Sequence, residues 1–217
     1  MLGGLIGLGG AEFRLPVLVS FYKFRTVQAV VVNLIVSLVT VLFSFIFRAG
    51  FVHLDRSHAP IIIDILIGSL IGSYIGARFA TRINEHTLTR IVAVFLVMLS
   101  AVLIGHDFLF HAQSLALPLP LKFILGALAG IMIGVFSSML GVAGAELIIP
   151  TIILLFAVNI KLAGTLSLAI SIPTIIMGLV RYGGLGKLSG LPSNIILWMA
   201  AGSIIGSLVG SLSAWLR

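Results

Sequence analysis

Long apolar segments, each able to cross a lipid bilayer as a helix, dominate this chain of 217 residues. They cover residues 27–47, 61–81, 88–104, 162–180 and 195–215. A helix needs about 20 apolar residues to cross the hydrocarbon core, and these segments come close to that length or exceed it. Only 9% of the residues are charged, against about 25% in soluble domains. The pattern predicts an all-α, polytopic integral membrane protein and lacks the short alternating segments of a β-barrel.

A glycine-rich break interrupts one apolar stretch that is too long for a single crossing. Residues 122–156 would form a straight helix of about 52 Å at 1.5 Å per residue, whereas the hydrocarbon core is roughly 30 Å thick. The sequence Gly-Val-Ala-Gly at 141–144 lies inside this stretch. We therefore expect two helical arms around the break. The break itself should be buried in protein or face a cavity, because lipid cannot satisfy exposed backbone groups.

The same break occurs twice, since GLGGAEFRLP at 7–16 returns as GVAGAELIIP at 141–150. Residues 7–80 align with 141–214 without a gap, and 12 of the 20 identities are Gly, Ser, Glu, Pro or Thr. Chance matches between two apolar helices would fall mainly on Leu and Ile. We therefore predict two homologous membrane repeats with Gly/Pro-broken helices, at 1–121 and 122–217. Compared with each other, the first repeat lacks an N-terminal helix and the second repeat lacks a C-terminal helix. We therefore expect the chain to be either a fragment or a short natural form.

Lysine and arginine residues in the loops predict how the chain is oriented. They are scattered singly, which argues against nucleic-acid binding despite the net charge of +7. If the second unit is inverted relative to the first, seven of them fall on one side and five on the other. The seven are Lys23, Arg25, Arg78, Arg82, Arg90, Arg181 and Lys187. Because cytoplasmic loops carry an excess of basic residues, the count favours inverted topology with this set inside.

The two glycine-rich motifs, each ending in a proline, resemble those of the sulfite exporter TauE/SafE family of bacterial membrane transporters. The sequence AGTLSL at 163–168 and the small-residue helix at 202–210 fit the same pattern. The resemblance covers nearly the whole chain and implies a multi-pass protein of the bacterial inner membrane. It also implies export of small sulfur-containing or organic anions, such as sulfite and sulfonates. The chain departs from the family pattern at Glu12 and Glu146, where the family often has an apolar residue, and in its additional Arg14.

The glycine-rich breaks are the first candidates for a substrate site. A helix that begins inside the membrane presents N–H groups without intrahelical partners and the positive end of its dipole, and both favour an anion. Glycine lets a ligand approach the backbone closely. On this interpretation Gly9, Gly10, Ala143 and Gly144 line the substrate cavity. The alternative is that these small residues only allow helices to pack tightly.

Charged residues beside both breaks are the second group of candidates. Glu12 and Glu146 occupy equivalent places, whereas Arg14 occurs only in the first copy, where Ile148 is its counterpart. A carboxylate would repel an anionic substrate, and protonation of a buried carboxyl group would remove that repulsion, so transport coupled to protons is one hypothesis. A structural role at the positive end of a helix dipole is the other. Arg14 could donate two hydrogen bonds to a sulfonate or carboxylate, or it could neutralise a glutamate.

Polar side chains share one face of two equivalent predicted helices. They are Asn33, Ser37 and Thr40 in the first copy and Ser167, Ser171 and Thr174 in the second. Their spacing by four and three residues places them on one side of a helix, which should face protein or a cavity. For Thr40 and Thr174 we favour hydrogen bonds between helices. Asn33, Ser37, Ser167 and Ser171 are candidate substrate contacts.

Glycines spaced by four residues form ridges on a third pair of equivalent helices. They are Gly68, Gly72 and Gly76 in the first copy and Gly202, Gly206 and Gly210 in the second. Such small-residue ridges let membrane helices approach closely, so we expect tight packing and no chemistry there.

These features favour a secondary transporter for small anions that works by alternating access around a site at mid-depth between two inverted units. The alternative is a permease for cations or protons with Glu12 and Glu146 as ligands. An enzyme is not expected, because the apolar spans contain no His or Cys and the chain has no phosphate-binding loop motif. No metal or cofactor is expected. The lipid bilayer, a small anion and protons are the predicted partners, and the oligomeric state stays open.

Overall fold

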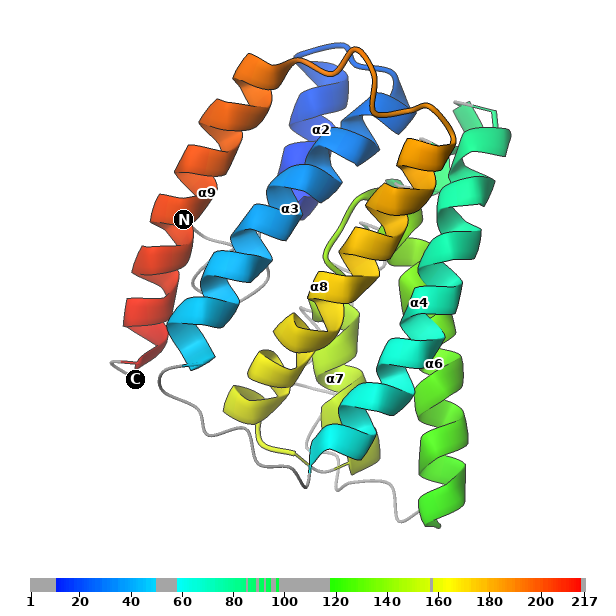
Figure 1. Ribbon diagram of the computed structural model, residues 1–217, viewed down its shortest axis with the longest axis vertical. Coiled ribbons are helices and arrows are strands. Elements are labelled where there is room, and N and C mark those ends of the chain that lie inside the picture. The colour runs from blue at the N-terminus through cyan, green and yellow to red at the C-terminus, as the bar shows by residue number, and fades with distance from the viewer. Residues whose placement is uncertain are drawn as a thin grey trace.

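The protein is a bundle of long helices (Figure 1), seen in a computed structural model. It describes residues 11–49, 58–84, 86–88, 90–91, 93–94, 97, 118–156 and 158–215. The helices within these ranges are α2 (Ala11–Ser20), α3 (Thr26–Ala49), α4 (Ala59–Arg82), α6 (Leu119–Leu140), α7 (Ala145–Phe156), α8 (Ile160–Gly184) and α9 (Ser193–Trp215). No strand occurs in this part of the chain, which confirms the predicted all-helical class.

Four of the described helices are long and apolar enough to cross a membrane. They contain the spans Thr26–Phe47, Ala59–Arg82, Leu119–Leu140 and Ile160–Gly184. Two shorter apolar helices, Ala145–Phe156 and Ser193–Leu208, accompany them. The apolar segments predicted at 27–47, 61–81, 162–180 and 195–215 lie within α3, α4, α8 and α9, whereas most of the segment at 88–104 lies outside the described residues.

The long stretch at 122–156 is divided into two helices that run in opposite directions. α6 ends at Leu140, and α7 begins only at Ala145. Gly141 ends α6 in the left-handed conformation, with φ 72° and ψ 21°, a conformation that suits glycine because it has no Cβ. The Ser137 hydroxyl group then donates to the Val142 carbonyl oxygen at 2.6 Å. The chain therefore reverses inside the bundle, and the 12-residue α7 runs back along α6 (Figure 1).

Equivalent helices in the two proposed units begin at equivalent positions. The pairs α2/α7, α3/α8 and α4/α9 begin at residues 11 and 145, 26 and 160, and 59 and 193, which in each case is the register of the sequence alignment. The paired helices also run in opposite directions, since α3 descends and α8 ascends in Figure 1, while α4 ascends and α9 descends. This arrangement supports our proposal of two duplicated, inverted units.

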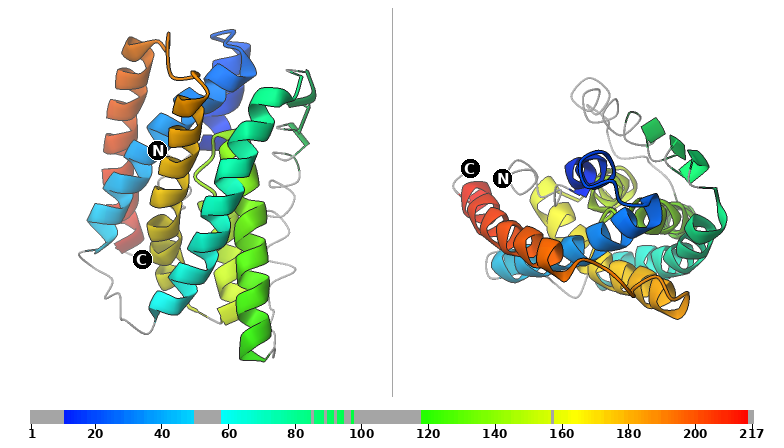
Figure 2. Two further views of the ribbon diagram at one scale, coloured as in Figure 1. Left: turned by 45° about the vertical axis from the view of Figure 1, so that its right-hand side comes forward. Right: turned by 90° about the horizontal axis from the view of Figure 1, so that it is seen from above.

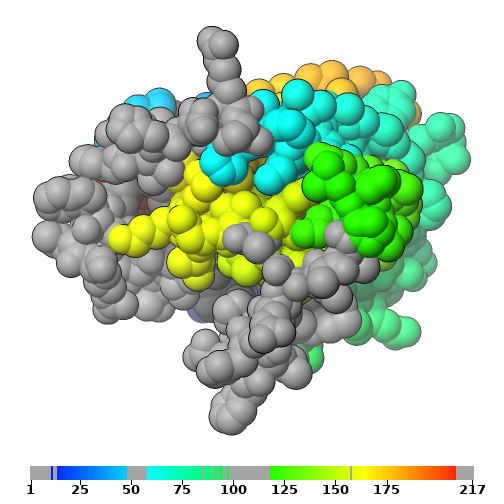
Figure 3. All heavy atoms as spheres, turned by 90° about the horizontal axis from the view of Figure 1, so that it is seen from below, coloured from blue at the N-terminus to red at the C-terminus, as the bar shows by residue number. Residues whose placement is uncertain are grey.

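Helices of the two units pack against one another. α3 packs against α9, and α8 packs against α4, so the equivalent helices α3 and α8 each contact a helix of the other unit. α3 and α8 also pack against each other. Figure 2 shows the same neighbours in two further views. Seen from below in Figure 3, the beginnings of α4, α6 and α8 gather at one end of the bundle. The centre of the protein is therefore formed by helices from both units.

Glycine ridges hold α4 and α6 in close contact. A Cβ at Gly68 or Gly72 would meet the backbone carbonyl oxygen of Ala127 or Ile131 in α6. On the facing helix, a Cβ at Gly134 would meet the backbone of Ser69. These contacts agree with the tight packing predicted for Gly68 and Gly72 from their spacing. At Gly202 in α9, by contrast, no described atom outside its own helix backbone lies within 4 Å of a Cβ position.

Candidate functional site

Hydroxyl groups near the middle of four helices join the two units in two equivalent places. In one place, the Ser73 hydroxyl of α4 donates to the Thr174 carbonyl oxygen of α8 at 2.9 Å. In the other, the Ser207 hydroxyl of α9 donates to the Ser203 carbonyl oxygen of its own helix at 2.6 Å and lies 3.5 Å from the Thr40 carbonyl oxygen of α3. Buried in these two places are Ser73, Thr174, Ser207 and Thr40.

The Thr174 hydroxyl bonds to a helix of the other unit as expected, with its oxygen 2.7 Å from the Ser69 hydroxyl oxygen of α4. The Thr40 hydroxyl instead donates to the Val36 carbonyl oxygen of its own helix at 2.8 Å.

Arg14 adds a charged side chain to the contact between α3 and α9, which the equivalent contact between α4 and α8 does not have. It extends from α2, and its Nη2 donates to the Ser37 hydroxyl at 2.8 Å. Its Nη1 donates to the Ser203 hydroxyl of α9 at 3.2 Å and lies 3.4 Å from the Thr40 hydroxyl. The guanidinium group thus lies between α3 and α9, among hydroxyl groups at mid-helix.

In the second unit the same position has no charge. Ile148, the counterpart of Arg14, is fully buried. There the Ser69 and Thr174 hydroxyl oxygens are 2.7 Å apart and bond directly. In the first unit, Arg14 bridges the equivalent pair of Ser203 and Thr40. The site between α3 and α9 therefore carries a positive charge that its counterpart between α4 and α8 lacks.

Asn33 attaches the beginning of α2 to α3. Its Nδ2 donates to the Ala11 carbonyl oxygen at 2.9 Å, and the side chain is fully buried. Its Oδ1 is also buried and has no hydrogen-bond partner among the described residues. Because α2 begins directly after the first glycine-rich motif, Asn33 positions the helix that carries Arg14. Gly9 and Gly10 and the side chain of Glu12 lie outside the described residues.

The second glycine-rich break is buried against the first unit. Ala143 is 1% exposed and packs in the same apolar cluster as Ala11 of α2 and Val30 of α3. A Cβ at Gly141 would lie 2.5 Å from the Val30 carbonyl oxygen, so the backbones of the break and α3 are in close contact. The first N–H groups of α7 point out of the helix start that follows, as in any α-helix. Such a buried helix start suits a small anion.

Glu146 lies in the first turn of α7 and is 3% exposed. It borders a small cavity of about 10 Å³, which is close to the volume that one water molecule requires. Gly144 and Ser137 also line this cavity. A carboxylate at this position is favoured by the helix dipole, so the structural role foreseen for Glu146 is compatible with its place.

The two serines predicted on α8 differ in what they bind. Ser167 is buried, and its hydroxyl donates to the Gly164 carbonyl oxygen of its own helix at 2.8 Å. Ser171 is also buried, but its hydroxyl has no hydrogen-bond partner among the described residues. Ser171 is the counterpart of Ser37, which binds Arg14. Of the two serines on α8, Ser171 is therefore the better candidate for a polar contact with a solute.

Four serines of the site were not among the candidate residues predicted from the sequence. They are Ser69 and Ser73 in α4 and Ser203 and Ser207 in α9, and each lies beside a glycine of the ridges. Their recurrence in both copies was the available signal, because packing alone would be served equally well by alanine.

Replacing Gly141 by alanine is expected to destabilise the protein. A φ of 72° costs a residue with a Cβ roughly 1–2 kcal/mol, and the new methyl group would also collide with the Val30 carbonyl oxygen. Gly186 is a matched control, because its φ is 68° and no atom of the described residues lies within 4 Å of its Cβ position. Thermal unfolding in detergent should show a loss about 1–3 kcal/mol larger for Gly141→Ala than for Gly186→Ala. Equal losses would contradict the close contact with α3.

Comparison with known proteins assigns the chain to a family. A profile of the family described as "Sulfite exporter TauE/SafE" matches residues 1–215. Searches of curated proteins and of solved structures found no match. The match covers almost the entire chain and agrees with the apolar spanning helices and the paired glycine-rich motifs. The chain therefore belongs to the TauE/SafE sulfite exporter family of membrane transporters.

Proposed function

We propose that this protein exports a small sulfur-containing or organic anion, such as sulfite or a sulfonate, from a site at mid-depth between its two units. The observation that carries the proposal is the position of Arg14. Its guanidinium group lies among the hydroxyl groups of Ser37, Thr40 and Ser203, near the middle of α3 and α9. A charged side chain at such depth is expensive, and it commonly marks a substrate pathway.

The chemistry of this site matches an oxyanion. A guanidinium group offers several N–H donors in one plane and binds a sulfonate or carboxylate through two parallel hydrogen bonds. Neighbouring hydroxyl groups can donate to the remaining oxygen atoms. The guanidinium and hydroxyl groups would together replace the hydration shell that the anion loses in the membrane. The buried start of α7 is a second place that offers an anion N–H groups and the positive end of a helix dipole.

The opposed directions of the paired helices support alternating access. Two inverted units can exchange conformations, so that the site opens first to one side of the membrane and then to the other. The membrane potential would drive an anion out of a negative cytoplasm by roughly 2.3 kcal/mol per charge per 100 mV. Export therefore needs no nucleotide, and the potential or a proton gradient would supply the energy.

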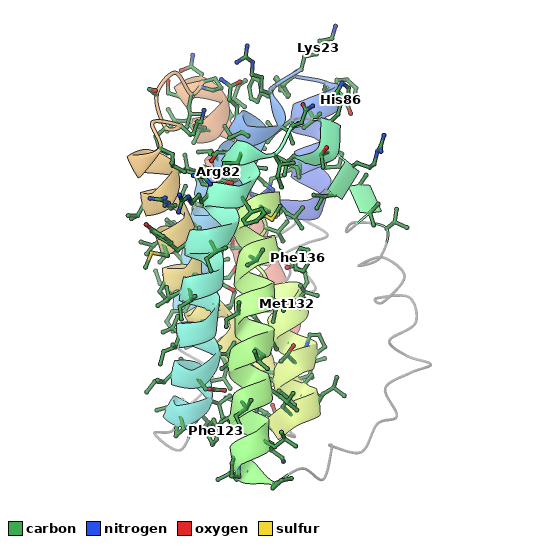
Figure 4. All side chains as sticks on the ribbon, turned by 90° about the vertical axis from the view of Figure 1, so that its right-hand side faces the viewer. Lys23, Arg82, His86, Phe123, Met132 and Phe136 are labelled. Atoms are coloured by element: carbon green, nitrogen blue, oxygen red, sulfur yellow. The ribbon has the colours of Figure 1, made fainter. Side chains whose placement is uncertain are left out.

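The distribution of basic residues supports the orientation that export requires. Figure 4 shows Lys23 and Arg82 at one end of the bundle, and α8 brings Arg181 and Lys187 to the same end (Figure 1). These belong to the set expected in the cytoplasm, and Lys122 and Lys161 lie at the beginnings of α6 and α8, at the opposite end (Figure 3). We assign the first end to the cytoplasmic face of the bacterial inner membrane.

Efflux from proteoliposomes tests the proposed function. Vesicles would be loaded separately with sulfite, methanesulfonate, sulfoacetate, acetate or sulfate, and a potential would be imposed with potassium and valinomycin. We expect efflux of one or more of these anions that requires the protein and increases when the loaded side is made negative. Current carried by sodium ions or protons, with none of the anions transported, would contradict the proposal and support the alternative cation permease with Glu146 as a ligand.

Replacing Glu146 by glutamine tests coupling to protons. Glutamine resembles the protonated carboxyl group, so the variant should transport at all pH values as the wild type does in acid. With methanesulfonate, whose charge is constant, wild-type efflux should be several-fold faster near pH 6 than near pH 8. Glu146→Gln should lose most of this dependence.

The equivalent variant Glu12→Gln shows whether both units contribute to the pH dependence. If both single variants keep the wild-type pH profile, the carboxyl groups have only the structural role at the helix starts. That result would remove proton coupling from the proposal and leave the anion site at Arg14 intact.

A further inference from the structure

A groove with two arginines lies on the outer face of α4, away from the proposed transport site. It has a volume of about 320 Å³ and is lined by Tyr74, Ile75, Arg78, Phe79, Arg82 and Ile83. Figure 4 places Arg82 at the same end of the bundle as Lys23 and His86, which is the end assigned to the cytoplasm. The groove therefore lies where a spanning helix leaves the membrane and meets the lipid headgroups.

The polar part of the groove carries arginine side chains that could bind a phosphate group. Arg78 and Arg82 are exposed and one helical turn apart, so both guanidinium groups can reach one ligand. A third arginine stands beside them, with the Arg181 guanidinium carbon 4.4 Å from the centre of the Tyr74 ring. The Nε of Arg181 is buried and has no acceptor among the described residues. The described acidic side chains, Asp64 and Glu146, lie near the beginnings of α4 and α7 instead.

An apolar stripe continues from the groove along α4. Every fourth residue belongs to it: Ile63, Ile67, Ile71, Ile75 and Phe79, which are 42–57% exposed. Residues four apart are neighbours on a helix surface, and because each step turns by about 40°, the stripe winds around α4 as it leaves the groove. The stripe therefore leads from the arginines towards the middle of the membrane. At 1.5 Å per residue the stripe is about 24 Å long, whereas one leaflet is about 15 Å thick, so an acyl chain attached to a headgroup at the arginines would cover the half of the stripe nearer to them.

We propose that this surface binds one anionic phospholipid, with its phosphate between Arg78 and Arg82 and an acyl chain along the stripe. Two or three cations, with no carboxylate beside them among the described residues, favour an anionic headgroup over a zwitterionic one. A second copy of the chain is disfavoured as the occupant, because it would bring another strongly basic surface, from a chain of net charge +7, against these arginines. The binding is separate from anion transport and does not depend on the substrate.

Native mass spectrometry of the purified chain in mild detergent tests this proposal. The protein would be titrated with phosphatidylglycerol or phosphatidylcholine of identical acyl chains. We expect the wild type to retain phosphatidylglycerol preferentially. The double variant Arg78→Gln, Arg82→Gln should lower that preference by roughly tenfold, because each basic residue near an anionic headgroup contributes substantially to binding.

A matched control removes two cations from the opposite end of the bundle. The double variant Lys122→Gln, Lys161→Gln has the same net charge as the arginine variant and should keep the wild-type preference. The proposal is overturned if both double variants lose the preference equally or if the arginine variant retains it. It is also overturned if inorganic phosphate displaces the lipid at equal concentration, which would indicate a site for free anions. A change in the dimer signal without a change in lipid adducts would assign the surface to a second copy and likewise contradict the proposal.

Discussion

Replacing Gly68 by leucine is expected to prevent the protein from folding, whereas the same replacement at Gly202 should leave it folded. The two glycines occupy equivalent positions in the proposed units, in α4 and α9. A Cβ at Gly68 would meet the backbone carbonyl oxygen and carbon atom of Ala127, and the amide nitrogen of Ile131 would be 3.0 Å away. At Gly202 no described atom outside its own helix backbone lies within 4 Å of that position.

The two replacements differ in effect because the atoms that surround Gly68 cannot move aside. A side chain at Gly68 points at the backbone of α6, which cannot move aside unless the two helices separate. Separation would also open the contacts at Gly72 and Gly134, because the glycines of both helices share one interface. Overpacking of a well-packed core costs about 1–3 kcal/mol, and a clash with backbone atoms lies at the upper end or above.

Expression, gel filtration and thermal unfolding in detergent would measure the effect. Gly68→Leu should yield little monodisperse protein, or an unfolding free energy lower by roughly 3 kcal/mol or more. Gly202→Leu should elute as the wild type and unfold at nearly the same temperature. If Gly68→Leu were as stable as Gly202→Leu, the close approach of α4 and α6 would be wrong. Gly68→Ala, with a smaller side chain, should have an intermediate effect.

The helices and the break could be predicted because their causes are local. Apolar runs of about 20 residues predict spanning helices, and α3, α4 and α8 match the predicted segments within a few residues. The turn at Gly141 was predictable because a stretch of 35 residues exceeds the membrane thickness, and because glycine adopts a positive φ readily. The register of the repeat also predicted where the later helices begin.

The partners of the polar residues were less predictable because they depend on packing between the units. Arg14 and Ser203 are 189 residues apart in the sequence, and nothing local indicates that α2 and α9 supply one site. The repeat marked both Ser37 and Ser171, but it could not show that only Ser37 meets an arginine. Ser167 binds the carbonyl oxygen of its own helix, a choice that depends on the rotamer.

Replacing Arg14 by glutamine is expected to lower anion efflux by roughly 100-fold at equal amounts of folded protein. Glutamine keeps a hydrogen-bond donor but removes the positive charge and the paired N–H groups. A hydrogen bond to a charged group contributes about 1.5–3 kcal/mol, and every 1.4 kcal/mol is about tenfold. Arg14→Lys keeps the charge without the planar donors, so its efflux should lie between those of the wild type and Arg14→Gln.

Two further variants separate substrate binding by Arg14 from its role in holding the helices. Arg25→Gln removes an exposed arginine from the loop after α2 and should transport as the wild type does. Ser203→Ala removes one hydrogen bond between Arg14 and α9 while leaving the charge in place, so efflux should fall only a few-fold. If Ser203→Ala reduced efflux as much as Arg14→Gln did, Arg14 would act mainly by joining α2 to α9. If Arg14→Gln transported at the wild-type rate, the anion site would have to lie elsewhere, and the buried break before α7 would be the remaining place for it.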